Sequence, residues 1–115
     1  MIKAIHSIIY PVKDIAKAKE LYQRLLGVEP TTDAPYYVGF KMGDLDIGLD
    51  PNGHNNGMTG PVNYWQVTDI KESLQQLLAA GAQTQQEVRD VGGGMLIATV
   101  LDADGNPTGL MQLPQ

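Results

Sequence analysis

The 115-residue sequence contains no cysteine, which excludes disulfides, thiolate metal sites and a cysteine nucleophile. It also has no apolar run near the roughly 20 residues that cross a bilayer. Its first residues, Met1 to Ala4, do not form the apolar core of a signal peptide. We therefore expect a soluble, cytoplasmic protein without membrane contact.

Basic residues are scarce. Lys and Arg number 8 against 13 Asp and Glu, so the formal net charge is -5, and the basic residues are scattered along the chain. Because phosphate contacts need clustered Lys and Arg, nucleic acid is not an expected partner. A cationic or neutral small ligand is easier to accommodate.

Familiar catalytic motifs are missing as well. The run Gly92-Gly93-Gly94 lacks the lysine and the following helix of a phosphate-binding loop, and it is typical of a flexible hairpin connection. The sequence shows no Ser-His-Asp arrangement, nucleophile elbow or helical histidine pair. Nothing here argues for nucleophilic catalysis.

The composition that remains is that of an ordinary globular protein, with 43% hydrophobic and 18% charged residues. A chain of this length buries most of its apolar surface without needing a disulfide or a structural metal, so residues 1–115 are expected to form one domain.

The first half of the chain predicts a strand, a helix and then at least two strands. Asp14 can cap the helix and Gly27 can end it. Met42 to Asp44 has the composition of a tight hairpin loop, and a further short strand can precede the hairpin. The strands are expected at Ala4–Val12, Tyr36–Lys41 and Leu45–Leu49, and the apolar stripe of the helix comprises Ile15, Ala18, Leu21, Tyr22, Leu25 and Leu26.

The second half repeats this order. Val12-Lys13-Asp14-Ile15 corresponds to Val67-Thr68-Asp69-Ile70, again with an aspartate at the start of a helix. The remaining predicted strands are Val62–Val67, Gln83–Val91, Met95–Leu101 and Thr108–Leu113. The pattern indicates an α+β fold made of two modules, residues 1–50 and 61–115. The segment 51–60 between them is dense in Gly and Asn, which predicts a mobile linker.

Two stretches resemble the vicinal oxygen chelate superfamily, which includes glyoxalases, bleomycin-resistance proteins and dioxygenases. The first runs from Val12-Lys13-Asp14 to Leu25-Leu26-Gly27. The second is Asp102-Ala103-Asp104-Gly105-Asn106 with the following Gly109-Leu110, where Ala103 departs from the usual proline. The resemblance covers nearly the whole chain. It implies two βαβββ modules whose curved mixed sheets enclose a cleft, commonly assembled as a homodimer.

In metal-dependent members of that superfamily, His, Glu or Gln residues on the first and last strand of each module hold a divalent ion. The resemblance places these positions at Ser7 and Val62 on the first strands and at Gly48 and Gly109 on the last strands. None of the four residues is a usual metal ligand. We therefore expect no metal and no cofactor in the family's site.

Other potential ligands lie close to these positions. His6 is one residue from Ser7, and since strand side chains alternate, it is expected to face the helix layer. A register shift or bulge would instead turn it toward the cleft. His54 falls in the linker and is expected to be solvated, whereas Asp46 and Asp50 flank Gly48 on the same strand face.

The same alternation predicts the residues that line the cleft, a mixed apolar surface with a few polar groups, while Ile8, Tyr10, Trp65 and Val67 pack toward the helices. This composition suits a small organic ligand. The expected ligand-binding residues are Ser7, Ile9, Gly48, Asp50, Val62, Tyr64, Gln66, Gly109 and Met111.

The preferred hypothesis is a metal-free small-molecule-binding protein rather than an enzyme. One alternative is a metal-dependent lyase, isomerase or dioxygenase with relocated ligands, or an enzyme that uses Tyr64, Asp46 or Asp50 as acid or base. Another is a small interaction module whose main role is its dimer interface.

Overall fold

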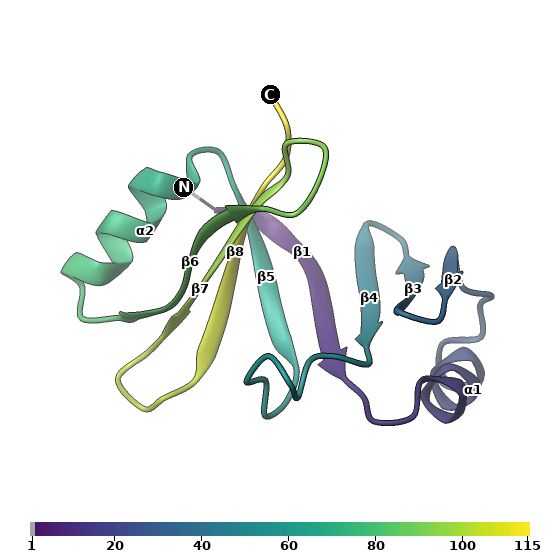
Figure 1. Cartoon of the computed structure of the whole chain (residues 1–115). Coiled ribbons are helices and arrows are strands. Elements are labelled where there is room, and N and C mark those ends of the chain that lie inside the picture. Colours follow the sequence, from purple (N-terminus) through teal and green to yellow (C-terminus); the bar gives the residue numbers. More distant parts are fainter. Residues whose placement is uncertain (1) are drawn as a thin grey trace. The chain divides into compact units, whose positions relative to one another are not determined.

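A computed structural model describes residues 2–115 (Figure 1). Strand, helix and three strands follow one another twice, so the predicted α+β class and the βαβββ repeat are confirmed. The first series is β1 (Ile2–Pro11), α1 (Ile15–Leu26), β2 (Thr32–Ala34), β3 (Tyr37–Met42) and β4 (Leu45–Asp50). The second series is β5 (Val62–Val67), α2 (Ile70–Ala79), β6 (Gln83–Asp90), β7 (Leu96–Leu101) and β8 (Pro107–Gln112).

The chain folds as two compact units whose limits differ from a simple division into halves. The N-terminal unit is Ser7–Val62, and the C-terminal unit comprises Asn63–Gln115 together with the segment that ends at His6. Strand β1 therefore begins in one unit and ends in the other. The predicted module limits, and the cleft that the resemblance implies, stay predictions.

The N-terminal unit has the strand order β2-β3-β4-β1. Strand β1 pairs with β4 in parallel, and the hairpin strands pair in antiparallel fashion, so the sheet is mixed as predicted. Helix α1 packs on β3 and β4. Its side of the sheet carries the buried core Val38, Phe40, Ile47 and Leu49, to which Ile8 and Tyr10 add from β1.

Helix α1 begins and ends where the sequence predicts. The Asp14 carboxylate accepts a hydrogen bond from the Lys17 backbone N–H at 3.1 Å, and Gly27 takes the left-handed conformation that ends the helix. Its core-facing residues are Ile15, Ala18, Tyr22 and Leu26. The prediction that Leu21 and Leu25 share this stripe is wrong, since these side chains are 60% and 71% exposed. At 100° per residue both lie on the flank of the helix, beyond the width that the sheet covers.

This difference gives a test with adjacent residues. We expect Leu26→Ala to lower the free energy of unfolding by about 2 kcal/mol, because Leu26 packs against the core, and Leu25→Ala to change it by less than about 0.5 kcal/mol. Urea denaturation of the two variants measures both values. Equal losses would contradict the packing of α1.

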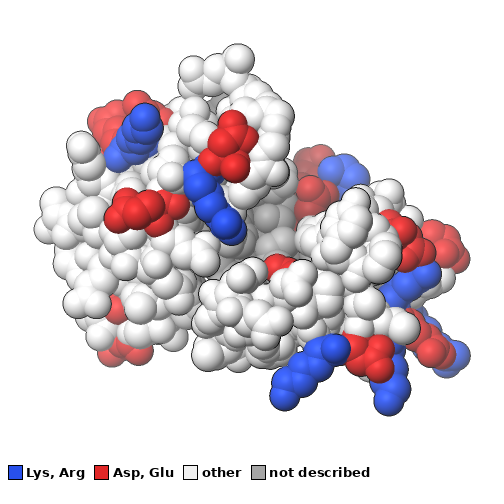
Figure 2. Space-filling model, viewed as in Figure 1, with Lys and Arg blue, Asp and Glu red and all other residues white. Residues whose placement is uncertain are grey.

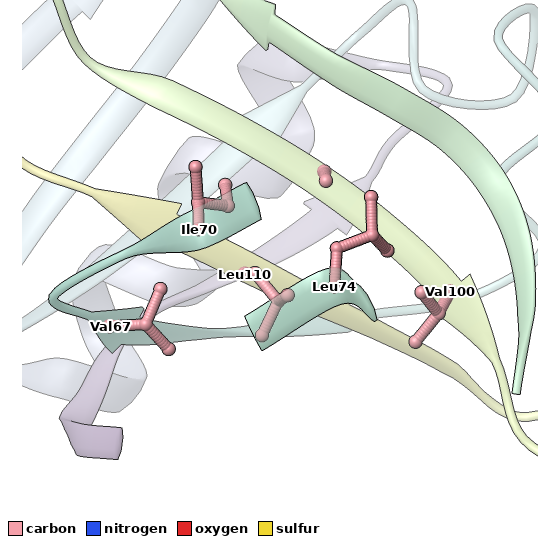
Figure 3. Close-up of a cluster of buried hydrophobic side chains, with 6 residues drawn as sticks. Val67, Ile70, Leu74, Val100 and Leu110 are labelled. Carbon is pink, nitrogen blue, oxygen red and sulfur yellow. The ribbon is translucent and has the colours of Figure 1, made fainter. Parts of the chain in front are cut away.

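The C-terminal unit has the order β5-β8-β7-β6, with the start of β1 beside β5. Helix α2 packs on β6, β7 and β8 and is capped by Asp69, whose carboxylate accepts from the Glu72 backbone N–H at 3.1 Å. Figure 3 shows the core between helix and sheet, where Ile70 and Leu74 of α2 meet the strand residues Val67, Val100 and Leu110. Val67 thus faces the helix as predicted. Trp65 is half-buried beside Leu110 in register.

The segment predicted as a mobile linker is folded into turns. Backbone N–H groups of Gly53, Asn56, Gly57 and Met58 all donate to carbonyls of residues 50–54. Gly53 is buried against Pro11, where a Cβ would lie 2.6 Å from the proline Cβ. The Asn and Gly residues therefore serve tight turns here rather than an extended tether. His54 is exposed, as predicted.

Within residues 2–115, no helix has the length and apolar character that crossing a bilayer requires. On the face seen in Figure 2, basic side chains lie among acidic ones. Two basic residues of α1 are already paired, Lys19 with Asp33 and Arg24 with Glu20. Figure 2 thus agrees with the scattered basic residues of the sequence.

Candidate functional site

The candidate site in the N-terminal unit is the sheet face opposite α1. Because Ile8 and Tyr10 pack toward the helix, alternation places Ser7 and Ile9 on the other face. The register Ser7 to Asp46, Ile9 to Gly48 and Pro11 to Asp50 then sets three predicted residues of β4 beside them. The structure therefore brings Ser7, Ile9, Gly48 and Asp50 together on one face.

The position of Gly48 is filled by a residue that the sequence did not single out, Tyr37. A Cβ at Gly48 would lie 2.7 Å from Tyr37 Cζ and 2.8 Å from Ile9 Cδ1, and closer still to Tyr37 Oη. Gly39 of β3 pairs with Gly48, so the Tyr37 ring can reach across two glycines. The two-residue turn Gly43-Asp44 sets this register, since β3 extends to Met42, which pairs with Leu45. The predicted three-residue loop, Met42 to Asp44, would instead pair Gly39 with Ile47, so the sequence carries no correct signal for Tyr37.

Tyr37 lies near two carboxylates. Burial raises the pKa of its phenol, and the negative charges of Asp46 and Asp50 raise it further. Asp46 also pairs with Lys41 at 3.2 Å, and the Asp50 carboxylate accepts from the Asn52 backbone N–H at 2.8 Å. The phenol therefore keeps its proton at neutral pH and can serve as a hydrogen-bond donor.

This environment predicts a late-titrating tyrosine. A pKa raised in the folded state means stability that is complete below the unfolded pKa, near 10, and that is lost as pH rises through the folded value. We expect Tyr37→Phe to remove this alkaline loss and one late step in the ultraviolet tyrosinate titration. The pKa of Tyr22 is also raised, mainly by burial, so Tyr22→Phe is the matched control for counting such steps. An unchanged titration in Tyr37→Phe would contradict the assignment.

The C-terminal unit has a comparable face opposite α2. Tyr64 pairs with Gly109 and Gln66 pairs with Met111, so these four predicted residues share one side of β5 and β8. A Cβ at Gly109 would lie 2.6 Å from Tyr64 Cε1 and 2.7 Å from Tyr64 Cγ. The tyrosine ring thus lies over the glycine, as Tyr37 reaches over Gly48 in the other unit.

The predicted ligand-binding residues differ in exposure. Ile9, Asp50, Tyr64 and Gln66 are half-buried, whereas the others are buried: Ser7, Gly48, Val62, Gly109 and Met111. The side chains of Ser7, Val62 and Met111 and the backbone at Gly48 and Gly109 are therefore covered in the folded chain. Their role in ligand binding stays a prediction.

The residues at the family's metal positions do not fit a metal ion. Ser7 and Val62 are buried and neither is a usual ligand, while the space beside Gly48 and Gly109 is taken by tyrosine side chains. Within residues 2–115, no cluster of three or more His, Cys, Asp or Glu side chains is placed to hold a metal. A donor introduced at either glycine would have to displace an aromatic ring.

A separate hollow of about 580 Å³ lies on α1 and the residues that follow it, away from the predicted site. Its charged lining includes Lys19, Glu20 and Arg24, which are engaged in ion pairs. None of the predicted ligand-binding residues lines this hollow.

Two successive βαβββ series, in each of which the first strand pairs in parallel with the last, define the general class of this protein. Residues 4–110 match the glyoxalase/bleomycin resistance protein/dioxygenase superfamily. The chain belongs to this superfamily, and the resemblance inferred from its motifs is confirmed. No sequence among curated proteins matches it significantly.

Solved structures share the fold at low identity. A glyoxalase/bleomycin resistance protein/dioxygenase superfamily member from Vibrio splendidus has a TM-score of 0.71 and 18% identity, covering 98% of this chain and 100% of its own. A structure named as an NAD-dependent benzaldehyde dehydrogenase from Legionella pneumophila has a TM-score of 0.75 and 22% identity, covering 93% and 97%. Methylmalonyl-CoA epimerase from Mycobacterium tuberculosis has a TM-score of 0.67 and 16% identity, covering 99% and 89%. These likenesses concern the fold alone.

Proposed function

We propose that this protein is a metal-free member of its superfamily that binds a small organic molecule on the sheet faces opposite its helices. The observation that carries the proposal is the set of residues at the four family positions, Ser7, Gly48, Val62 and Gly109. None supplies a usual metal donor, and tyrosine side chains pack over both glycines. Sheet faces that lack metal donors at these positions and carry tyrosine rings over both glycines suit the binding of an organic ligand better than Lewis-acid chemistry.

The composition of these faces supports an organic ligand. Ile9 and Met111 are apolar, and Tyr64, Gln66 and Asp50 provide polar groups that are half-buried. Small-molecule sites typically combine apolar area with a few polar groups that fix orientation. The names of the structural neighbours, which include an epimerase and a dehydrogenase, describe those proteins and give no reaction for this chain.

Metal analysis and ligand screening together test the proposal. We expect the dialysed protein to hold substoichiometric divalent metal and to gain thermal stability from members of a small-molecule library. For a confirmed hit, Gln66→Leu should weaken binding, whereas Gln85→Leu, at an exposed site on β6, should not. Stoichiometric metal after dialysis, or binding unaffected by Gln66→Leu and by Asp50→Asn, would overturn it.

A second candidate is an enzyme that works by acid–base chemistry on the N-terminal face. The observation that favours it is Tyr37, a phenol kept protonated near the carboxylates of Asp46 and Asp50. Such a group can donate a proton to a bound substrate while a carboxylate accepts one. Turnover of a screened compound that is lost in both Tyr37→Phe and Asp50→Asn would favour this candidate over simple binding.

The proposal includes a homodimer in the cytoplasm. Size-exclusion chromatography with light scattering tests the dimer, and a monomer at micromolar concentration would remove this part of the proposal.

A further inference from the structure

A row of three residues spans the neighbouring strands β5, β8 and β7 of the C-terminal unit on the face opposite α2. Tyr64 of β5 pairs with Gly109 of β8, and Gly109 pairs with Thr99 of β7. The neighbours of Thr99 on its strand, Ala98 and Val100, belong to the helix-facing core, so alternation turns Thr99 to the other side. Thr99 therefore shares a face with Tyr64 and Gly109.

Thr99 is 3% exposed, and its hydroxyl oxygen has no hydrogen-bond partner among the residues that the structure describes. A buried hydroxyl without a partner is destabilising, whereas valine has the same shape and carries no such cost. Buried polar groups of this kind call for an explanation, and a hydrogen bond to a bound molecule supplies one.

The middle of the row has no side chain, and the Tyr64 ring lies over it. Tyr64 is half-buried and Gly109 is buried. The Tyr64 ring therefore occupies the space above Gly109, next to Thr99, that a larger residue at position 109 would fill. Adjacent residues on the same face are Ile97 and Met111, which pair with each other in register and carry no charge, and the exposed Arg89 of β6 pairs with Ile97 on its other side. Thr99 is buried whereas Arg89 is exposed, so a charged ligand group placed at Thr99 would lose its hydration, and an uncharged group is favoured there.

We propose that Thr99 is a ligand-binding residue and that Tyr64 is the movable cover of its site. This inference rests on the proposed binding function and gives it a ligand class, a neutral aromatic molecule with one hydroxyl or carbonyl group. The ring of the ligand takes the place of the Tyr64 ring over Gly109, and its polar group bonds to the Thr99 hydroxyl. Rotation of the Tyr64 side chain opens the site.

The first test measures the effect of one substitution on the stability of the ligand-free protein and on its affinity for phenol. We expect Thr99→Val to raise the melting temperature of the ligand-free protein by roughly 2–6 °C, because it removes an unpartnered hydroxyl. The same substitution should weaken the binding of phenol by about 3- to 10-fold in an NMR titration, since one hydrogen bond is lost. Thr99→Ser retains the hydroxyl and should keep the phenol affinity near that of the wild type.

Toluene is the matched probe, because it has the ring without the hydroxyl. Thr99→Val should leave toluene binding unchanged. Tyr64→Ala should strengthen the binding of both probes, because it removes the ring that covers Gly109. Tyr64→Leu, a smaller change of volume, replaces Tyr64→Ala if the alanine variant does not fold. Equal effects of Thr99→Val on phenol and toluene, or no binding of phenol to either Tyr64 variant, would overturn the inference.

The outcome is distinguishable from failure of the proposed function. If library ligands bind the metal-free protein but respond to neither Thr99→Val nor Tyr64→Ala, the inference fails and the proposed function stands. If the dialysed protein retains stoichiometric metal while phenol still depends on Thr99, the proposed function fails and the assignment of Thr99 stands.

Discussion

Replacing Gly109 by alanine is expected to lower the free energy of unfolding by about 3 kcal/mol, while alanine at Gly48 should cost about 1 kcal/mol. The atoms near a Cβ at Gly109 are Cγ, Cδ1 and Cε1 of Tyr64, so much of the ring, including the atom nearest its backbone, must move. At Gly48 the nearest atom is the terminal oxygen of Tyr37, with Tyr37 Cζ and Ile9 Cδ1 slightly farther away. The far end of a side chain shifts more easily than its base.

Urea denaturation of the two variants checks this order. Gly60→Ala is a suitable control, because a Cβ there has no heavy atom within 4 Å. The double variant Tyr64→Ala/Gly109→Ala should lose less than the sum of its parts, because removing the ring leaves room for the new methyl group. Additive losses would show that Gly109 is needed for some reason other than the Tyr64 ring.

The comparison also bears on metal binding. A glutamate at Gly109 would place a carboxylate at a position where the family resemblance implies a metal ligand, yet its Cβ meets the same ring atoms. We therefore expect Gly109→Glu to be at least as destabilising as Gly109→Ala and to acquire no metal by itself. The glycine and the tyrosine would have to change together.

Much of the fold followed from the sequence because local signals and hydrophobic periodicity agreed. Asp14 and Asp69 cap helices at the predicted residues, and the strand Val62–Val67 has the predicted limits. The sequence permits a short strand before the hairpin but does not locate it at Thr32–Ala34, since three polar or small residues carry no periodic pattern. Its assignment depends on pairing with β3, which is a contact between separate segments.

The errors have the same origin. The exposure of Leu21 and Leu25 depends on how far the sheet extends beneath α1, which helical periodicity does not specify. The places of Gly48 and Gly109 on the strands were predictable from family spacing, but the rings that lie over them were not. Tyr37 reaches Gly48 across a hairpin, and Tyr64 reaches Gly109 from a strand 45 residues earlier in the sequence (109 minus 64). Cross-strand packing decides which space remains for a ligand.

Phe40→Ala is expected to lower the free energy of unfolding by about 3–5 kcal/mol, a large share of the 5–15 kcal/mol typical of a domain. Phe40 is 1% exposed in the core beneath α1. Met42 lies two residues later on the same face of β3 and is 37% exposed, so Met42→Ala is a matched control with an expected loss under about 1 kcal/mol. Similar losses in the two variants would contradict the assigned core.

The same variant tests whether the two units unfold together. Strand β1 is continuous through both, with residues up to His6 in the C-terminal unit and Ser7–Pro11 in the N-terminal unit. Unfolding of either unit therefore disrupts a strand of the other, and we expect one cooperative transition. Phe40→Ala and Leu110→Ala, one in each core, should then shift that single transition as a whole, by both fluorescence and circular dichroism. Two transitions, of which each variant moves only one, would mean that β1 does not couple the units and that each binding face forms independently.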